Sequence, residues 1–219
     1  MSSNSRMERL RATLDPAHTA LLTMEVQRGV VGDMASLRGL ADVCDEIGLV
    51  DSIAEVARHA RAAGVKVVHC PCETRADGVG FVENCRIFAM VGKIRNADGT
   101  RNVEQGSESA AIMPEVLDPS DVVVGRITGM SPFMSTQLDQ VLRNIGIKTV
   151  IATGVSVNLG IFGMTLNAID LGYQAVVVRD AVAGVPMSYA NDVIDNSLIN
   201  LATILTKAEL FEIWDSMKS

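Results

Sequence analysis

Short apolar runs alternate along this chain with segments of helical periodicity, and this alternation restricts the fold more than any other feature of the sequence. The runs have the length of strands and are apolar on both faces: 19–26, 65–70, 121–126, 148–154, 173–180 and 202–205. Helical spacing is found at 50–64, 135–146, 158–172, 189–201 and from Thr206 onward. Because strands that are apolar on both faces need cover on both sides, the pattern predicts an α/β, three-layer, Rossmann-like fold with a parallel sheet between helices.

The spacing of these elements also predicts the domain organisation. Residues 1–18 precede the first strand and are expected to form an N-terminal arm, whereas residues 19–219 are expected to form a single domain around one core. We expect a long loop after the first strand. Residues 71–120 are rich in Gly, Pro, Asn and Asp, which indicates a functional loop region rather than a separate domain. Thr206 and Glu209 have the spacing of a capping box at the start of the last helix.

Charge and cysteine content limit the possible partners and the compartment. A formal net charge of −7, without a basic patch, disfavours binding to nucleic acid or to an anionic membrane. The N-terminal residues contain no apolar core of a secretion signal, and no run reaches the roughly 18 to 20 apolar residues of a membrane span. Four cysteines are too few for a disulfide scaffold in a chain of 219 residues. We therefore expect a cytoplasmic protein that binds neither nucleic acid nor membrane.

The segment 158–172 differs from the other helical segments because apolar residues surround most of its circumference. They are Leu159, Ile161, Phe162, Met164, Leu166, Ala168, Ile169 and Leu171. Such a helix lies either in the centre of a core or half-buried beneath a second subunit. We favour the second interpretation, which predicts a homodimer or homotetramer formed through this helix.

Three of the predicted strands end in residues that could carry chemistry, and in a parallel sheet the ligand lies beyond the carboxyl ends of the strands. The first strand ends in Glu25 and Gln27 (MEVQRG), and the strand at 121 ends in Arg126 (VVVGRITG). The strand at 148 runs into TGVSVNLGIFGMT, a tight turn that opens a helix. An α/β enzyme often mounts its nucleophile on such a turn, yet this stretch contains no cysteine and no Gly-x-Ser-x-Gly motif.

The order of these motifs resembles the isochorismatase-like (cysteine) hydrolase superfamily, which includes nicotinamidases, carbamoylsarcosine-type amidases and isochorismatases. The resemblance covers about residues 19–185, and TGVSVN with LGYQAVVVRDAVAG is its most specific part. It implies a six-stranded parallel sheet flanked by helices, dimers or tetramers, and a non-proline cis peptide at Val155–Ser156. The aspartate, lysine and cysteine of the family amidases fall on Glu25, Arg126 and Gly160, so this chain resembles a divergent member without the nucleophilic cysteine.

These departures bear on the expected reaction. Without a thiol at Gly160, covalent acyl transfer is disfavoured, and isochorismatases in the same superfamily also lack the cysteine and instead protonate a vinyl ether. We therefore expect acid–base hydrolysis of a vinyl-ether, C–N or C–O bond in a small, carboxylate-bearing, anionic metabolite. Arg126 stays protonated and could grip a carboxylate. Pairing with Arg126 would favour Glu25 as a base, whereas a substrate carboxylate on Arg126 would favour it as an acid. A purely structural ion pair is the further alternative for both residues. The alternative is a catalytically silent member that binds a metabolite or a protein partner.

Further residues around these motifs are candidates for substrate binding or for other roles. The expected substrate-binding set is Gln27, Arg75, Phe133, Val155, Ser156 and Asn158, although turn or capping hydrogen bonds are an alternative role for the last two. The stretch HCPCE (69–73) offers one histidine and lacks the paired cysteine spacing of a zinc site, so we expect neither metal nor cofactor. Buried, inert thiols are the favoured interpretation of Cys70 and Cys72, with a relocated nucleophile as the alternative.

Overall fold

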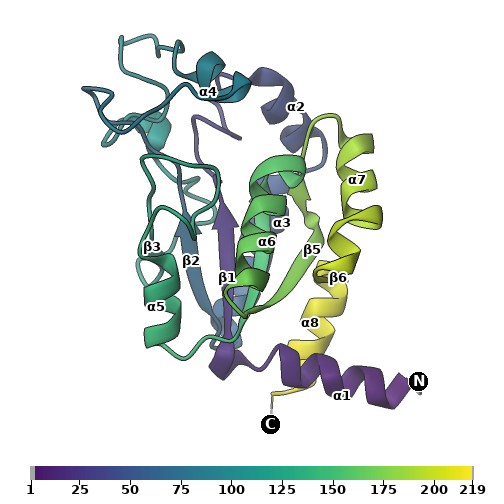
Figure 1. The fold of residues 1–219 in the computed structure, drawn as a ribbon. Coiled ribbons are helices and arrows are strands. Elements are labelled where there is room, and N and C mark those ends of the chain that lie inside the picture. Colours follow the sequence, from purple (N-terminus) through teal and green to yellow (C-terminus); the bar gives the residue numbers. More distant parts are fainter. Residues whose placement is uncertain (1–2, 219) are drawn as a thin grey trace.

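Six parallel strands form the centre of the molecule in the computed structural model, which describes residues 3–218. They lie in the order β3-β2-β1-β4-β5-β6, so the chain starts in the middle of the sheet, builds one half and then crosses to the other (Figure 1). Every pairing is parallel. The strands are β1 (Thr19–Met24), β2 (Lys66–Cys70), β3 (Val122–Val123), β4 (Thr149–Val155), β5 (Gln174–Ala183) and β6 (Thr203–Leu205). The predicted α/β fold with a parallel sheet is confirmed.

Helices cover both faces of this sheet and make the three layers. On one face lie α3 (Leu49–Ala62) and α8 (Lys207–Asp215), and on the other lie α5 (Leu138–Asn144), α6 (Phe162–Asp170) and α7 (Met187–Asn196). Above the carboxyl ends of the strands in Figure 1 lie α2 (Arg38–Glu46) and α4 (Arg86–Val91). The remaining elements are α1 (Ser3–Thr13) and the short turns η1 (Pro16–His18), η2 (Glu108–Ala110), η3 (Val157–Ile161) and η4 (Leu198–Asn200).

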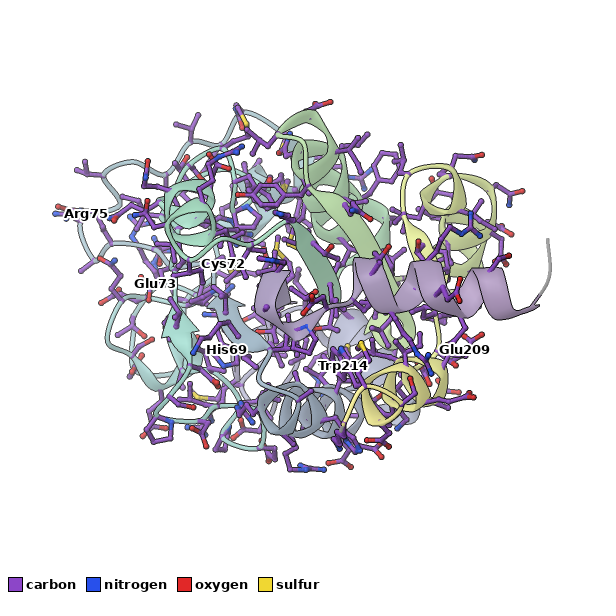
Figure 2. All side chains as sticks on the ribbon, turned by 90° about the horizontal axis from the view of Figure 1, so that it is seen from below. His69, Cys72, Glu73, Arg75, Glu209 and Trp214 are labelled. Atoms are coloured by element: carbon purple, nitrogen blue, oxygen red, sulfur yellow. The ribbon has the colours of Figure 1, made fainter. Side chains whose placement is uncertain are left out.

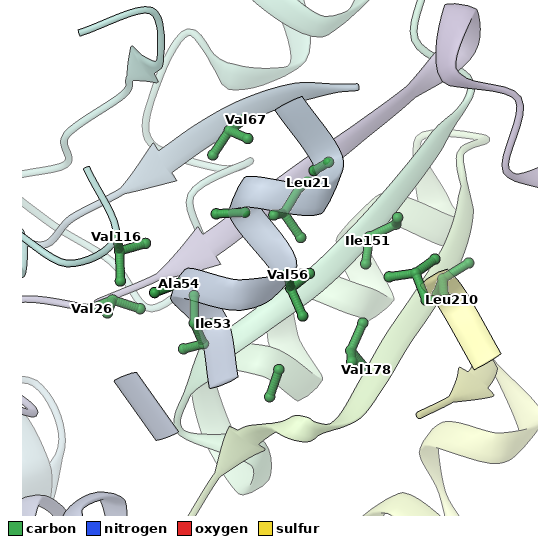
Figure 3. Packing of buried hydrophobic residues seen from close by; sticks show 14 of the residues in the cluster. Leu21, Val26, Ile53, Ala54, Val56, Val67, Val116, Ile151, Val178 and Leu210 are labelled. Carbon is green, nitrogen blue, oxygen red and sulfur yellow. The ribbon is translucent and has the colours of Figure 1, made fainter. Parts of the chain in front are cut away.

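The pleat of the strands distributes their side chains between two cores. Leu21 of β1 faces the core beneath α3 and α8, where Figure 3 shows it near Val56 of α3 (Figure 3). Its neighbour Leu22 belongs to the opposite core, with Leu138 of α5 and Met164 of α6. Each such side chain contributes about 1.5–3 kcal/mol when it is withdrawn from water. Because β1 is buried at every position, its apolar pattern is continuous rather than alternating.

The N-terminal residues pack against the last helix. Leu14 is fully buried, and its carbonyl accepts a hydrogen bond from the Trp214 indole at 3.3 Å. Arg11 donates to the Ser216 hydroxyl at 2.9 Å. The expected N-terminal arm thus includes a helix, α1, that is attached to α8, while residues 1 and 2 lie outside the described part of the chain. At the start of α8, the predicted capping box between Thr206 and Glu209 is present.

Two helices appear where the sequence suggested loops. The long loop expected after β1 contains α2, whose Ala41 and Cys44 are buried, and the irregular region 71–120 contains the short helix α4. The strand expected at 121–126 is paired only at Val122 and Val123 in the sheet. Beyond these residues the chain stays beside β2. The backbone N–H of Val124 donates to the carbonyl of His69 at 2.8 Å, and the backbone N–H of Arg126 donates to the carbonyl of Pro71 at 3.1 Å.

The apolar segment 158–172 divides between the core and the surface. Met164, Thr165 and Ala168 of α6 are buried, whereas the side chains of Leu159 and Ile169 are 45% and 37% exposed. That a second subunit covers the segment 158–172 stays a prediction. Within residues 3–218, no helix is both long and apolar enough to cross a membrane.

Candidate active site

A cavity of about 180 Å³ lies at the carboxyl ends of four adjacent strands. Glu25 follows β1, Cys72 follows β2, Arg126 follows β3 and Ser156 follows β4, and all four residues line the cavity. The strands approach closely here because Gly154 of β4 has no side chain: a Cβ on it would lie 2.2 Å from the carbonyl oxygen of Met24. The topology therefore brings together residues that are up to 131 positions apart in the sequence (25 to 156).

Glu25 and Arg126 form an ion pair on the wall of this cavity. Arg126 Nη2 donates to Glu25 Oε1, while Nε donates to the carbonyl of Gly129 at 3.0 Å and Nη1 to that of Cys70 at 3.4 Å. The Arg126 side chain is 2% exposed and that of Glu25 is 22% exposed. Burial acts to lower the pKa of the guanidinium, but the charge and hydrogen bond of Glu25 act against it and the pKa is raised. Arg126 is therefore a fixed cation on the cavity wall.

The backbone of Glu25 is unusual for a residue with a side chain. Its φ is 54°, in the left-handed region that non-glycine residues rarely occupy. Main-chain bonds hold it there, because its N–H donates to the carbonyl of Cys70 at 3.2 Å and its carbonyl accepts from Gln27 at 2.9 Å. Such conformations persist where the surrounding structure enforces them, often at functional sites. Here the conformation ends β1 and accompanies a carboxylate that lines the cavity.

Gly160 and Ser156 form the part of the cavity that belongs to the helix after β4. This helix begins with η3, a single π-helical turn that contains Gly160, and the Val155–Ser156 peptide is cis, as the resemblance predicted. A Cβ on Gly160 would lie 2.8 Å from Met24 Cε and 3.1 Å from the carbonyl oxygen of Val155. A side chain at this position would require a shift of the end of the Met24 side chain and a small adjustment near the Val155 carbonyl. The Ser156 hydroxyl donates to Asn158 Oδ1 at 3.0 Å.

The cysteines at the end of β2, Cys70 and Cys72, are held in their protonated form. Burial raises the pKa of the Cys70 thiol to about 12, and Arg126 only partly opposes this shift. Burial also raises the pKa of Cys72, and the Glu25 charge raises it further. Since the thiolate is the nucleophile, neither group is activated for attack. Cys72 is also fixed through its backbone, because its N–H donates to Gln27 Oε1 at 2.8 Å and its carbonyl accepts from Gln27 Nε2 at 2.8 Å.

A second carboxylate, that of Glu73, also lines the cavity. It was not among the predicted site residues. Glu73 follows Cys72, and its Oε2 accepts a hydrogen bond from Gln105 Nε2 at 2.9 Å. Figure 2 shows Cys72 and Glu73 side by side, while Arg75 extends to the edge of the molecule (Figure 2). The stretch HCPCE contained the signal for Glu73, since a carboxylate directly after a strand end is a candidate for a site in any parallel sheet.

Apolar side chains from α2, α4 and their flanking segments form a large part of the remaining cavity wall. They include Leu37, Leu40, Phe81, Ile87 and Phe88. The rings of Phe81 and Phe88 pack edge to face with centroids 5.6 Å apart. These residues were missed because the segments that carry them were expected to be loops. The short apolar run RIFAMV at 86–91 was the available signal.

The structure separates five predicted substrate-binding residues from the cavity lining. The Arg75 side chain, 47% exposed, pairs with Asp77 at 2.7 Å, and Phe133 is buried against Tyr173 with ring centroids 5.7 Å apart. Gln27 is fully buried, and its side chain bonds Cys72 and the carbonyl of Ala110. Val155 is fully buried in the core. The Asn158 Oδ1 atom accepts a hydrogen bond from the Ser156 hydroxyl. These side chains contact other parts of the protein, and none of the five lines the cavity. Among the predicted site residues, the cavity is lined by Glu25, Arg126, Ser156 and Gly160.

A buried network lies behind the site, between β1, β2 and the start of β3. His69 is 1% exposed, and its ring bonds Thr23 Oγ1 through Nδ1 at 2.6 Å and Asp121 Oδ2 through Nε2 at 2.8 Å. Both ring nitrogens are therefore occupied, and the histidine is not available as a base for Ser156. In the described part of the chain, no group of three or more His, Cys, Asp or Glu side chains is arranged to hold a metal ion.

Comparisons with known proteins agree with this fold. A family model described as the isochorismatase domain matches residues 19–209. A cysteine hydrolase from Pseudomonas syringae pv. phaseolicola superposes with a TM-score of 0.75, at 20% identity, over 92% of this chain and 94% of that one. An isochorismatase family protein from Desulfovibrio vulgaris superposes with a TM-score of 0.74, at 25% identity, over 90% and 98% of the two chains.

Sequence comparison identifies relatives with a named activity. The ureidoacrylate amidohydrolase RutB of Methylobacterium radiotolerans is 29% identical over 176 residues, which cover 77% of this chain and 68% of that protein. The six-stranded parallel sheet with its flanking helices is thus an isochorismatase-like fold. The chain belongs to the isochorismatase family, as the family model over residues 19–209 shows.

Proposed function

We propose that the cavity is a hydrolytic site that uses water as the nucleophile and Glu25 as the group that moves the proton. The observation that carries this proposal is the Glu25–Arg126 pair in a cavity that is also lined by Gly160. By the resemblance, Gly160 stands where the family amidases carry their cysteine.

Glu25 acts as a general base in the proposed reaction. It accepts a proton from water while the water oxygen bonds to the acyl carbon of a C–N or C–O bond, and it returns the proton to the leaving nitrogen or oxygen as that bond breaks. The direct contact with Arg126 supports this role over that of an acid, because the carboxylate is engaged as an anion. The first N–H groups of the helix that begins at Val157 supply positive dipoles near the developing oxyanion.

The contacts of Arg126 also bear on the charge of the substrate. A substrate carboxylate on Arg126, as the sequence suggested, would have to displace Glu25. The guanidinium is almost entirely buried, and its other bonds go to main-chain carbonyls. These contacts support a role for Arg126 in positioning Glu25 rather than in gripping the substrate.

A kinetic comparison of three proteins tests the proposal. Wild type is screened for hydrolysis of amides, esters and vinyl ethers, and Glu25→Gln and Cys72→Ser are then measured on the substrates found. We expect Glu25→Gln to lower kcat/KM by about 10²-fold or more, because removal of a general base costs that much, and Cys72→Ser by less than about tenfold. Equal activity of Glu25→Gln and wild type would refute the role of Glu25. Loss of activity in Cys72→Ser alone would instead indicate a cysteine enzyme.

The second candidate function is binding without catalysis. It is favoured by the differences from the amidase pattern at Glu25, Arg126 and Gly160. Hydrolysis of any substrate in the screen that depends on Glu25 would exclude it. A protein that binds ligands in the cavity but turns over none of the three substrate classes would support it.

A further inference from the structure

The charged side chains of the proposed hydrolytic site are not balanced. Three charged residues line the cavity: Glu25, Glu73 and Arg126. The positive charge of Arg126 is compensated by Glu25. Two carboxylates and one guanidinium leave one excess negative charge in the cavity, and this charge belongs to Glu73. An anionic ligand would be repelled, which differs from the expectation of an anionic substrate.

Glu73 has capacity for a further hydrogen-bond donor. Its Oε2 accepts from the neutral amide of Gln105 at 2.9 Å, and no ion pair joins it to a cation in the described part of the chain. A carboxylate offers about four acceptor positions, and a neutral amide does not compensate its charge. The strongest additional partner is an ammonium group or another N–H donor. Glu73 is half-buried, so such a partner would be shielded from bulk water.

The rest of the wall favours an apolar ligand body. Leu37 and Leu40 approach from α2 and its start, and Phe81, Ile87 and Phe88 approach from α4 and the segment before it. Binding of an apolar group between these side chains is stabilised in proportion to the apolar area that is removed from water. A small, highly polar molecule would leave this wall in contact with water.

We propose that the cavity accepts an uncharged or cationic nitrogen compound with an alkyl or aryl body, namely an apolar amide or amine, and that Glu73 holds its N–H group. This inference rests on the proposed function for the choice of cavity, and it names the class of substrate. Anionic molecules are excluded by Glu73 as long as Glu25 occupies Arg126.

Three probes of equal chain length test the charge preference. Hexylamine, hexanamide and hexanoate are titrated into the protein by calorimetry at pH 7. We expect the amine and the amide to bind at least about tenfold more tightly than the carboxylate. Affinity should rise about fourfold for each methylene group from butanamide to hexanamide. Tightest binding by hexanoate, or no dependence on chain length, would overturn the proposal.

Two charge-removing variants locate the preference at Glu73. Glu73→Gln should weaken hexylamine binding about tenfold or more, and it should change hexanamide binding by less than about threefold, because the amide loses no charge pairing. The matched control is Glu83→Gln, a glutamate of the same segment that is exposed and lies outside the cavity lining. A similar loss of hexylamine binding in both variants would show a diffuse effect of net charge and would refute a specific role of Glu73.

Two variants of α4 test the apolar wall. Phe88→Ala should weaken hexanamide binding about tenfold and reduce the gain per methylene group, since an aromatic surface is removed from the wall. The control is Met90→Ala on the same helix, which is 46% exposed and lies outside the cavity lining. If both variants bind hexanamide as wild type does, the ligand body lies elsewhere and the proposal fails.

The Glu25→Gln variant separates this inference from the proposed function. With Glu25 neutral, Arg126 regains an uncompensated charge, so hexanoate binding should become at least about tenfold tighter than in wild type. Unchanged weak binding of hexanoate would refute the assignment of the Arg126 charge to Glu25. Because these experiments measure binding, a Glu25→Gln variant that kept its turnover would end the proposed catalytic role without changing the ligand preference of Glu73.

Discussion

Two acids beside the central strands, Asp121 just before β3 and Glu25 just after β1, differ in how many of their hydrogen-bond acceptor positions the protein occupies. The carboxylate of Asp121, just before β3, accepts from Arg61 Nε at 2.9 Å and Nη2 at 2.6 Å. It also accepts from His69 at 2.8 Å and from the backbone of Asp118 at 2.9 Å. Its side chain is 2% exposed. Such a carboxylate has no remaining capacity for a substrate, so its role is structural.

Glu25 has fewer partners than Asp121. Within residues 3–218, Arg126 is the one side chain bonded to its carboxylate, and the Glu25 side chain remains 22% exposed toward a cavity. Burial of an ion pair therefore does not by itself mark a functional site. The two acids differ because the Glu25 carboxylate, beside the cavity, still has positions that can accept hydrogen bonds, whereas the Asp121 carboxylate has none. This difference predicts opposite consequences when each acid is removed.

The largest expected effect is the loss of stability in Asp121→Ala. The substitution leaves Arg61 without its carboxylate and the His69 Nε2–H without an acceptor, and breaking a buried pair from one side costs about 3–5 kcal/mol. Since the Arg61 side chain is 21% exposed, water compensates part of this cost, and we expect about 3 kcal/mol. Urea unfolding followed by circular dichroism measures the change in the free energy of unfolding.

The control for this variant is Asp195→Ala. Asp195 pairs with Arg179 at 2.6 Å, but both side chains lie at the surface, with exposed fractions of 50% and 37%. Exposed pairs contribute up to about 1 kcal/mol, so Asp195→Ala should be nearly neutral. Equal losses in the two variants would contradict the structural role assigned to the Asp121 network.

The second effect is a fall in stability between pH 6.5 and pH 5 that originates in His69. Burial lowers the pKa of His69 below its usual value of 6.5, although Asp121 acts to raise it. Below pH 6.5 the unfolded chain therefore binds a proton that the folded chain does not, and the free energy of unfolding decreases as the pH falls. One such group accounts for at most about 1.4 kcal/mol per pH unit, and it has no effect above about pH 7.5.

The variant His69→Gln tests the origin of this pH dependence. Its amide can still donate to Asp121 and accept from Thr23, but it does not titrate. We expect the slope of the unfolding free energy between pH 6.5 and pH 5 to become smaller than in wild type. An identical slope in both proteins would assign the pH dependence to other groups.

The alternation of apolar runs was sufficient to predict the layers of the fold. Parallel strands place their carboxyl ends at one edge, so Glu25, Arg126 and Ser156 could be assigned to one region from strand positions alone. The capping box at Thr206 was equally predictable, because it depends on residues three positions apart. These features are set by local pattern and by general rules of topology.

The cavity wall and the pairing of Arg126 could not be predicted, because they depend on long-range contacts. Gln27 follows the end of β1 and was expected to bind substrate. Its side-chain amide instead donates to the carbonyls of Cys72 and Ala110, 45 and 83 positions away. The same contacts fix the loop from which Glu73 faces the cavity. Whether Arg126 contacts Glu25 or a ligand depends on side-chain positions within a few ångströms, and the periodicity of the sequence does not determine these positions.

The smallest expected effect is the change in stability of Glu25→Gln, and it completes the comparison with Asp121. The amide oxygen of glutamine still accepts from Arg126, and the bonds of the guanidinium to the carbonyls of Gly129 and Cys70 are unchanged. We therefore expect a loss of about 1 kcal/mol rather than the larger cost of a fully enclosed pair. The same urea titration as for Asp121→Ala gives the value. A loss of 3 kcal/mol or more would mean that Glu25 is as essential to the fold as Asp121, and the distinction between a structural acid and a functional one would fail. A loss near 1 kcal/mol together with lost turnover would identify an acid that is retained for chemistry.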